Sequence, residues 1–219
     1  MSPTQRISAI FSFWAGLALL SGVVQGATVR QDFAEGRITC TIMSSRENPE
    51  IAATVLPIAM KAALERVGPP QEPARLEIRL LDPPPFYKRV KALFQAEAFA
   101  TQTGDEIVLH PGNDPLKLAF RLGHELTHWL VYKHNLERPP LWLDEGLAQI
   151  VAAEAAETCA RTRKQDLERP HPPKLESHLF SLDELVGLQA YPQATARSAA
   201  FYWQAEALVR AIYGRLGSS

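Results

Sequence analysis

Two histidines four residues apart, His124 and His128, stand in a segment that is predicted to be helical on independent grounds. Asp114 is suited to cap this helix, Pro115 fits its first position, and apolar residues then recur every three to four positions until about Tyr132. Residues four apart on a helix lie on one face, about 5–6 Å from each other. The two imidazoles are therefore expected to point in the same direction.

The full motif reads His-Glu-Leu-Thr-His. Two imidazoles on one helical face can bind a single zinc ion at about 2.0–2.1 Å. Glu125 is rotated by about 100° from His124 around the helix, so it is not placed to be a third ligand. We expect it to accept a proton from a metal-activated water molecule instead. The alternative is that both histidines are structural residues of a core helix.

A second helix, predicted from about Leu141 to Ala156, carries the segment Trp-Leu-Asp-Glu-Gly-Leu-Ala at Trp142–Ala148. Sixteen residues separate His128 from Glu145. A catalytic zinc ion has three protein ligands and one open position, and two histidines with a glutamate are an established set. Asp144 is an alternative third ligand, or an outer hydrogen-bond acceptor that orients a ligand imidazole.

The two motifs together, His-Glu-x-x-His and Trp-Leu-x-Glu-Gly-x-Ala, resemble those of gluzincin zinc metallopeptidases, in particular small peptidase-MA-like domains. They are also similar to the corresponding stretch of zinc aminopeptidases. The resemblance covers residues 94–153 well and the C-terminal helix more loosely. It implies peptide-bond hydrolysis with one zinc ion per chain, held by His124, His128 and Glu145, and Glu125 as general base. The Gly-x-Met-Glu-Asn signature of the aminopeptidases is missing, so the likeness does not extend to exopeptidase specificity.

The resemblance also implies two contacts with a peptide or protein substrate. In the family layout, residues 95–99 form an edge strand, and the backbone at Ala96, Glu97 and Ala98 would pair with an extended substrate. Tyr202 stands where related domains place an aromatic hydroxyl near the substrate oxyanion. The alternative for Tyr202 is core packing. The side chain of Glu97 could grip a substrate amino group, and an ordinary solvated glutamate is the alternative there.

The remaining pattern predicts one α+β domain. Strands are predicted at residues 37–43, 75–81, 93–101 and 106–110, and helices at 49–68, 114–132, 141–156, shortly after Ser181, and at 198–216. We expect a small mixed sheet with an antiparallel edge strand packed on the motif helix, and a mostly helical C-terminal part. By the resemblance, this fold is zincin-like.

Residues 1–26 differ in kind from the rest of the chain. Arg6 is their only charge, residues 7–24 form an apolar stretch, and a small residue, Gly26, ends the segment. This is the layout of a signal peptide, so we expect cleavage near Gly26 and export of residues 27–219 as a single metallopeptidase-like domain, periplasmic or secreted. An N-terminal membrane anchor is the alternative, because the stretch approaches the roughly 20 residues of a membrane span.

The composition limits the classes of partner that the chain is expected to bind. The formal net charge is −1 and basic residues form no block, so neither nucleic acid nor an anionic membrane surface is expected as a partner. Cys40 and Cys159 both lie in the part expected to be exported, where a disulfide and two buried free thiols are both compatible with the sequence. Two other functions stay open: a non-catalytic, zinc-stabilised interaction domain of the cell envelope, and a binding domain whose motif is accidental.

Overall fold

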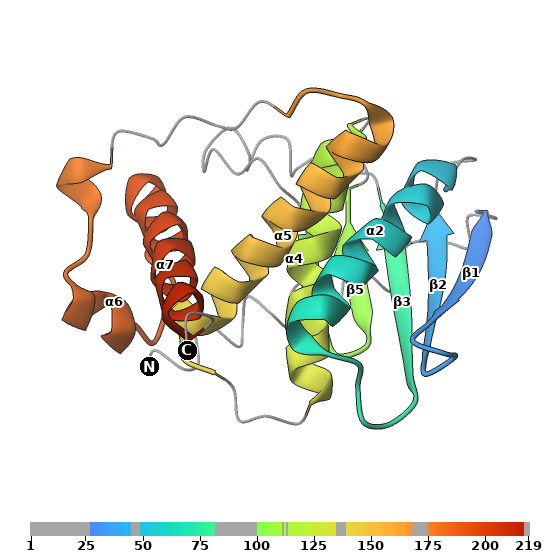
Figure 1. The fold of residues 1–219 in the computed structure, drawn as a ribbon, viewed down its shortest axis with the longest axis horizontal. Helices are drawn as coiled ribbons and strands as arrows, with labels where there is room; N and C mark the ends of the chain where they lie inside the picture. The colour runs from blue at the N-terminus through green and yellow to red at the C-terminus, as the bar shows by residue number, and fades with distance from the viewer. Residues whose placement is uncertain are drawn as a thin grey trace, which may run out of the picture.

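The computed structural model describes residues 27–44, 49–81, 100–110, 112, 114–134, 139–167 and 175–216. They form a mixed α+β structure with one five-stranded sheet (Figure 1). The strands are β1 (Thr28–Phe33), β2 (Ile38–Ser44), β3 (Ala74–Leu80), β4 (Ala100–Thr103) and β5 (Glu106–Leu109). The helices are α2 (Glu50–Val67), α4 (Pro115–Lys133), α5 (Leu141–Arg163), the short 3₁₀ helix η1 (Glu176–His178), α6 (Leu182–Gly187) and α7 (Thr195–Leu216).

The sheet is mixed, in the order β1-β2-β3-β5-β4. Its central pairs, β2 with β3 and β3 with β5, are parallel, whereas the edge strands β1 and β4 run antiparallel to their neighbours. The parallel pair β2 and β3 needs a crossover, and α2 provides it. The predicted α+β class is confirmed, and β4 forms an antiparallel edge of the mixed sheet; residues 93–99 of the strand predicted at 93–101 lie outside the described ranges.

One face of the sheet carries the hydrophobic core, because side chains alternate between the faces along each strand. The register places Ile42 beside Ile78 and Ile78 beside Ile107, and all three side chains are fully buried. The apolar sides of α2 and α4 join these residues in one cluster. The motif helix α4 is thus held against the sheet by Leu122, Leu126 and their neighbours.

The C-terminal part is helical, as predicted. α7 packs against α5, and a second cluster of buried residues joins α6 and α7 around Phe201. In Figure 1 this part lies at the opposite end of the molecule from β1, and α5 runs between the two ends. The elements available to build a site between the two clusters are therefore α4, α5 and α7.

Local signals account for most helix boundaries. Asp114 caps α4 by accepting hydrogen bonds from the backbone N–H groups of Leu116 at 2.9 Å and Lys117 at 3.4 Å. Ser181 and Glu184 form the predicted capping box at the start of α6. These caps satisfy N–H groups that have no partner within the helix.

Two helix boundaries differ clearly from the prediction, and one strand was not predicted. α5 continues past Ala156 to Arg163, and Cys159 and Ala160 in this extension remain buried; Lys164 ends it in the left-handed conformation, with φ 54°. α7 begins at Thr195 rather than Ser198. β1 was not predicted, since it is an edge strand whose side chains are only half-buried or exposed and whose alternation is weak.

Several predictions fall on residues outside the described ranges. They are the signal peptide at residues 1–26 and the substrate strand at 95–99 with Ala96, Glu97 and Ala98. Cys40 and Cys159 lie within the described part, and both are buried free thiols of the sheet and helix core. Burial raises the pKa of Cys40 to about 12, and the nearby Asp32 adds to the rise.

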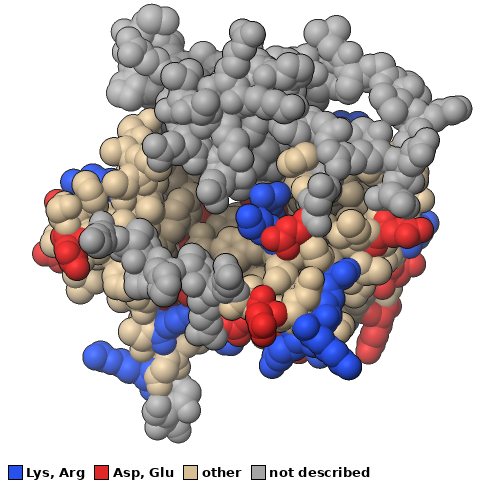
Figure 2. Space-filling model, turned by 90° about the horizontal axis from the view of Figure 1, so that it is seen from above, with Lys and Arg blue, Asp and Glu red and all other residues tan. Residues whose placement is uncertain are grey.

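The described helices include none with the length and apolar character that crossing a membrane requires. On the face drawn in Figure 2, basic and acidic side chains of the described residues are intermixed rather than gathered into a patch of one sign. This distribution is in keeping with the formal net charge of −1 for the whole chain.

Candidate metal centre

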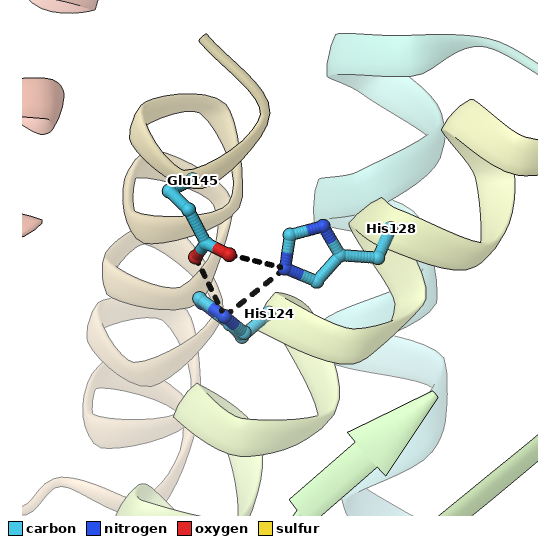
Figure 3. Close-up of side chains that lie close together, drawn as sticks. All are labelled: His124, His128 and Glu145. Atoms are coloured by element: carbon cyan, nitrogen blue, oxygen red, sulfur yellow. Dashed lines mark hydrogen bonds and ion pairs between the residues drawn. The ribbon is translucent and has the colours of Figure 1, made fainter. Parts of the chain in front are cut away.

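Three side chains predicted as ligands converge between α4 and α5 (Figure 3). His124 and His128 project from α4 with their Nε2 atoms 3.2 Å apart. Glu145 reaches them from α5, with its Oε2 atom 3.3 Å from His124 Nε2 and its Oε1 atom 3.7 Å from His128 Nε2. One ligand atom from each residue lies within 4.8 Å of the other two, so the three could hold a metal ion.

The Nδ1 atom of His128 contacts the carboxylate of Asp144. It lies 3.0 Å from Asp144 Oδ1, while Nε2 faces the cluster. Burial alone would lower the pKa of His128, but the carboxylates of Asp144 and Glu145 outweigh burial and raise it to about 10. Asp144 is thus placed as the outer acceptor that orients an imidazole, and it is not one of the three converging residues.

Glu145 is a carboxylate almost without solvent, since only 2% of the residue is exposed. Burial alone would raise its pKa, but the imidazoles of His124 and His128 outweigh burial and hold the pKa well below its ordinary value. Its Oε1 atom accepts a hydrogen bond from the hydroxyl of Tyr191, whereas Oε2 is buried and has no hydrogen-bond partner among the described residues. His124 Nδ1 is also buried without a hydrogen-bond partner in the described part of the chain.

Glu125 lies on the buried side of α4, 8% exposed, next to this cluster. Burial raises its pKa, the charge of Glu145 raises it further, and His124 and His128 act in the opposite direction. Its carboxylate is not among the three converging ligand groups. A carboxylate that stands beside a metal position without occupying it is placed to exchange a proton with a bound molecule.

Tyr202, from α7, lies beside the three converging side chains. Its ring centroid lies 6.5 Å from that of His124, in an edge-to-face arrangement. Burial raises the pKa of Tyr202, and the charges of Glu145 and Glu125 raise it further, so the phenol keeps its proton. Its ring also packs on Phe201, with centroids 5.4 Å apart, so the side chain lies beside the candidate site and packs on the second hydrophobic cluster.

Two glycines next to the ligands allow the helices to approach closely. A Cβ atom added at Gly123, directly before His124, would lie 3.1 Å from the Cα atom of Ala152 on α5. A Cβ atom at Gly146, directly after Glu145, would lie only 2.4 Å from the carbonyl oxygen of Ala205 on α7. Glycine costs about 1 kcal/mol relative to alanine inside a helix, so close packing is the physical reason for both residues.

In comparisons with known proteins, no protein-family model matches this chain and no curated protein matches its sequence. Inference about the site therefore depends on its own residues and their arrangement.

Tyr191 was not predicted from the sequence as a residue of the site. It lies in the segment between α6 and α7, 46 residues after Glu145, and no motif or periodicity surrounds it. Only the folded chain brings its hydroxyl to the carboxylate of Glu145. A second aromatic hydroxyl near the predicted one at Tyr202 was the only signal available in the sequence.

Gly146→Ala should destabilise the protein, because the new methyl group would overlap the backbone of α7 at Ala205 and the side chain of Val209, at 2.6 Å. Overpacking of this kind typically costs about 1–3 kcal/mol. The free energy of unfolding in urea would measure it. Gly187→Ala is the matched control, since a Cβ atom there meets nothing within 4 Å. Equal stability of the two variants would show that contact with α7 does not set the position of α5.

Proposed function

We propose that this protein is a zinc metallopeptidase of the gluzincin type, with a zincin-like fold, that hydrolyses peptide bonds. The observation that carries the proposal is the convergence of His124, His128 and Glu145, with Glu125 buried beside them. Support also comes from the order of elements, in which the strand β5 precedes the helix with both histidines and a second helix brings the glutamate. We further propose that the chain is exported, as its first 26 residues indicate.

The donor set fits zinc. Ligand atoms at the corners of a tetrahedron, about 2.0–2.1 Å from a zinc ion, lie about 3.3 Å from each other. The separations of 3.2 Å between the two Nε2 atoms and 3.3 Å between His124 Nε2 and Glu145 Oε2 agree with this value. Two imidazoles and one carboxylate are ligands that zinc accepts in catalytic sites. The buried Oε2 atom of Glu145, which has no hydrogen bond from the described residues, would gain a cation as its partner.

When bound, zinc would supply a Lewis acid that activates a water molecule and polarises the substrate carbonyl. Glu125 would accept the proton of the attacking water and deliver it to the departing amine, which is general base and then general acid catalysis. Tyr202 would donate a hydrogen bond to the carbonyl oxygen as negative charge develops on it. The backbone at Ala96, Glu97 and Ala98 would hold the peptide in extended form.

The first test is metal binding. We expect about one zinc ion per chain, and we expect His124→Ala, His128→Ala and Glu145→Ala each to weaken binding strongly, because only two protein ligands remain. Asp144→Ala should lower the affinity less, by about 10–100-fold, since it removes only the partner of His128. Zinc content after dialysis and competition with a chelator would measure both. Loss of zinc from Asp144→Ala but not from Glu145→Ala would contradict the ligand assignment.

The second test separates an enzyme from a zinc-stabilised interaction domain. Glu125→Gln keeps the size of the side chain but cannot accept a proton at neutral pH, so zinc should stay bound while cleavage of a peptide library falls by at least about 10²–10⁴-fold. Glu176→Gln, an exposed residue of η1, is the matched control. A wild-type protein with zinc bound that cleaves no peptide would favour the interaction domain.

The third test concerns Tyr202. Tyr202→Phe keeps the ring that packs on Phe201 and removes only the hydroxyl. We expect kcat to fall by about 10²–10³-fold, as for other donors to a developing oxyanion, with zinc affinity unchanged. Steady-state kinetics on the best library peptide would provide the value. An unchanged kcat would assign Tyr202 to core packing alone.

A further inference from the structure

Tyr191 connects the C-terminal part of the chain to the metal centre. Its hydroxyl donates a hydrogen bond to Oε1 of Glu145, although the two residues are 46 positions apart. Its ring packs edge-to-face on Phe201, with centroids 6.3 Å apart, and Phe201 is fully buried. The residue itself is 45% exposed, so its side chain extends from the surface to a carboxylate that is nearly inaccessible to solvent.

This contact makes the two carboxylate oxygens of Glu145 unequal. Oε1 holds the hydrogen bond from Tyr191 and lies 3.7 Å from His128 Nε2. Oε2 is buried, has no hydrogen-bond partner among the described residues, and faces the other imidazole, 3.3 Å from His124 Nε2. A buried carboxylate oxygen that lacks a hydrogen bond is costly even beside an imidazole, so Oε2 is the atom with most to gain from a cation.

We propose that Tyr191 is a positioning residue of the metal centre, which favours binding of the metal by Glu145 through Oε2 alone. The inference rests on the proposed zinc site, but it does not depend on hydrolysis. A carboxylate that binds through both oxygens occupies two coordination positions, whereas a catalytic zinc ion with three protein ligands keeps one position open. By holding Oε1, Tyr191 preserves that open position.

The role of Tyr191 differs from those of the other polar neighbours. Asp144 contacts His128 on the nitrogen that faces away from the cluster. Tyr202 lies beside His124 and is proposed to contact the substrate. Tyr191 is bonded to the third ligand itself, through the oxygen that the proposed metal would not use. Two of the three ligands therefore have a hydrogen-bond partner that orients them.

The test is Tyr191→Phe, which keeps the ring contact with Phe201 and removes only the hydroxyl. We expect zinc affinity, measured by chelator competition, to fall by about 10–100-fold, the usual effect of losing an outer partner of a ligand. We also expect the visible absorption of the cobalt-substituted protein to weaken, because a carboxylate freed to bind through both oxygens raises the coordination number. Tyr213→Phe is the matched control, a tyrosine of similar exposure, 41%, outside the cluster.

Both changes are required by the proposal. Wild-type zinc affinity in Tyr191→Phe, or an unchanged cobalt spectrum, would overturn it. Thermal unfolding of the metal-free proteins separates the hydroxyl's effect on the ligand from an effect on the fold: a loss of affinity accompanied by a matching loss of metal-free stability would also count against it. A wild-type protein that binds zinc but cleaves no peptide would reject the proposed hydrolysis and leave this inference standing.

Discussion

The close contact of α5 with both α4 and α7 is the constraint on which the rest of the site depends. Gly123 and Gly146 stand directly beside ligand residues, and a methyl group at either position would meet backbone of the facing helix. Helices usually pack with their axes 8–10 Å apart, and small residues at the contact allow the near end of that range. Gly123 permits this close approach between α4 and α5, across which Glu145 meets the two histidines.

This packing places a carboxylate in a buried position, which is unfavourable without compensating contacts. It buries the carboxylate of Glu145 against two imidazoles and, within the part of the chain that the structure describes, leaves one of its oxygens without a hydrogen bond. Burying a charge is unfavourable unless it is paired and hydrogen-bonded. His124, His128 and Tyr191 supply part of that compensation, and a cation between them would supply the rest. The buried carboxylate would be stabilised if these side chains bound a cation, whereas it would be unfavourable if they served only as a contact between helices.

Features that depend on residues close together in the sequence were predicted correctly. The spacing of His124 and His128 on a helix capped by Asp114, and the segment around Glu145, were sufficient to predict which three side chains meet. Contacts that depend on the path of the chain were less accessible. The edge strand β1 has a weak alternation, α5 continues beyond its apolar pattern, and Tyr191 reaches Glu145 only because the segment before α7 returns to the site.

The site residues come from elements that belong to, or contact, both hydrophobic clusters of the molecule. The three candidate ligands come from α4, which belongs to the sheet core, and from α5, which packs on both α4 and α7. Tyr191 adds a tie from the segment before α7, whose neighbour Phe201 belongs to the second cluster. A cation that binds the folded state and not the unfolded chain stabilises every contact that shapes its site. The proposed metal would therefore act at the junction of the two clusters, linking the stability of the sheet part to that of the helical part.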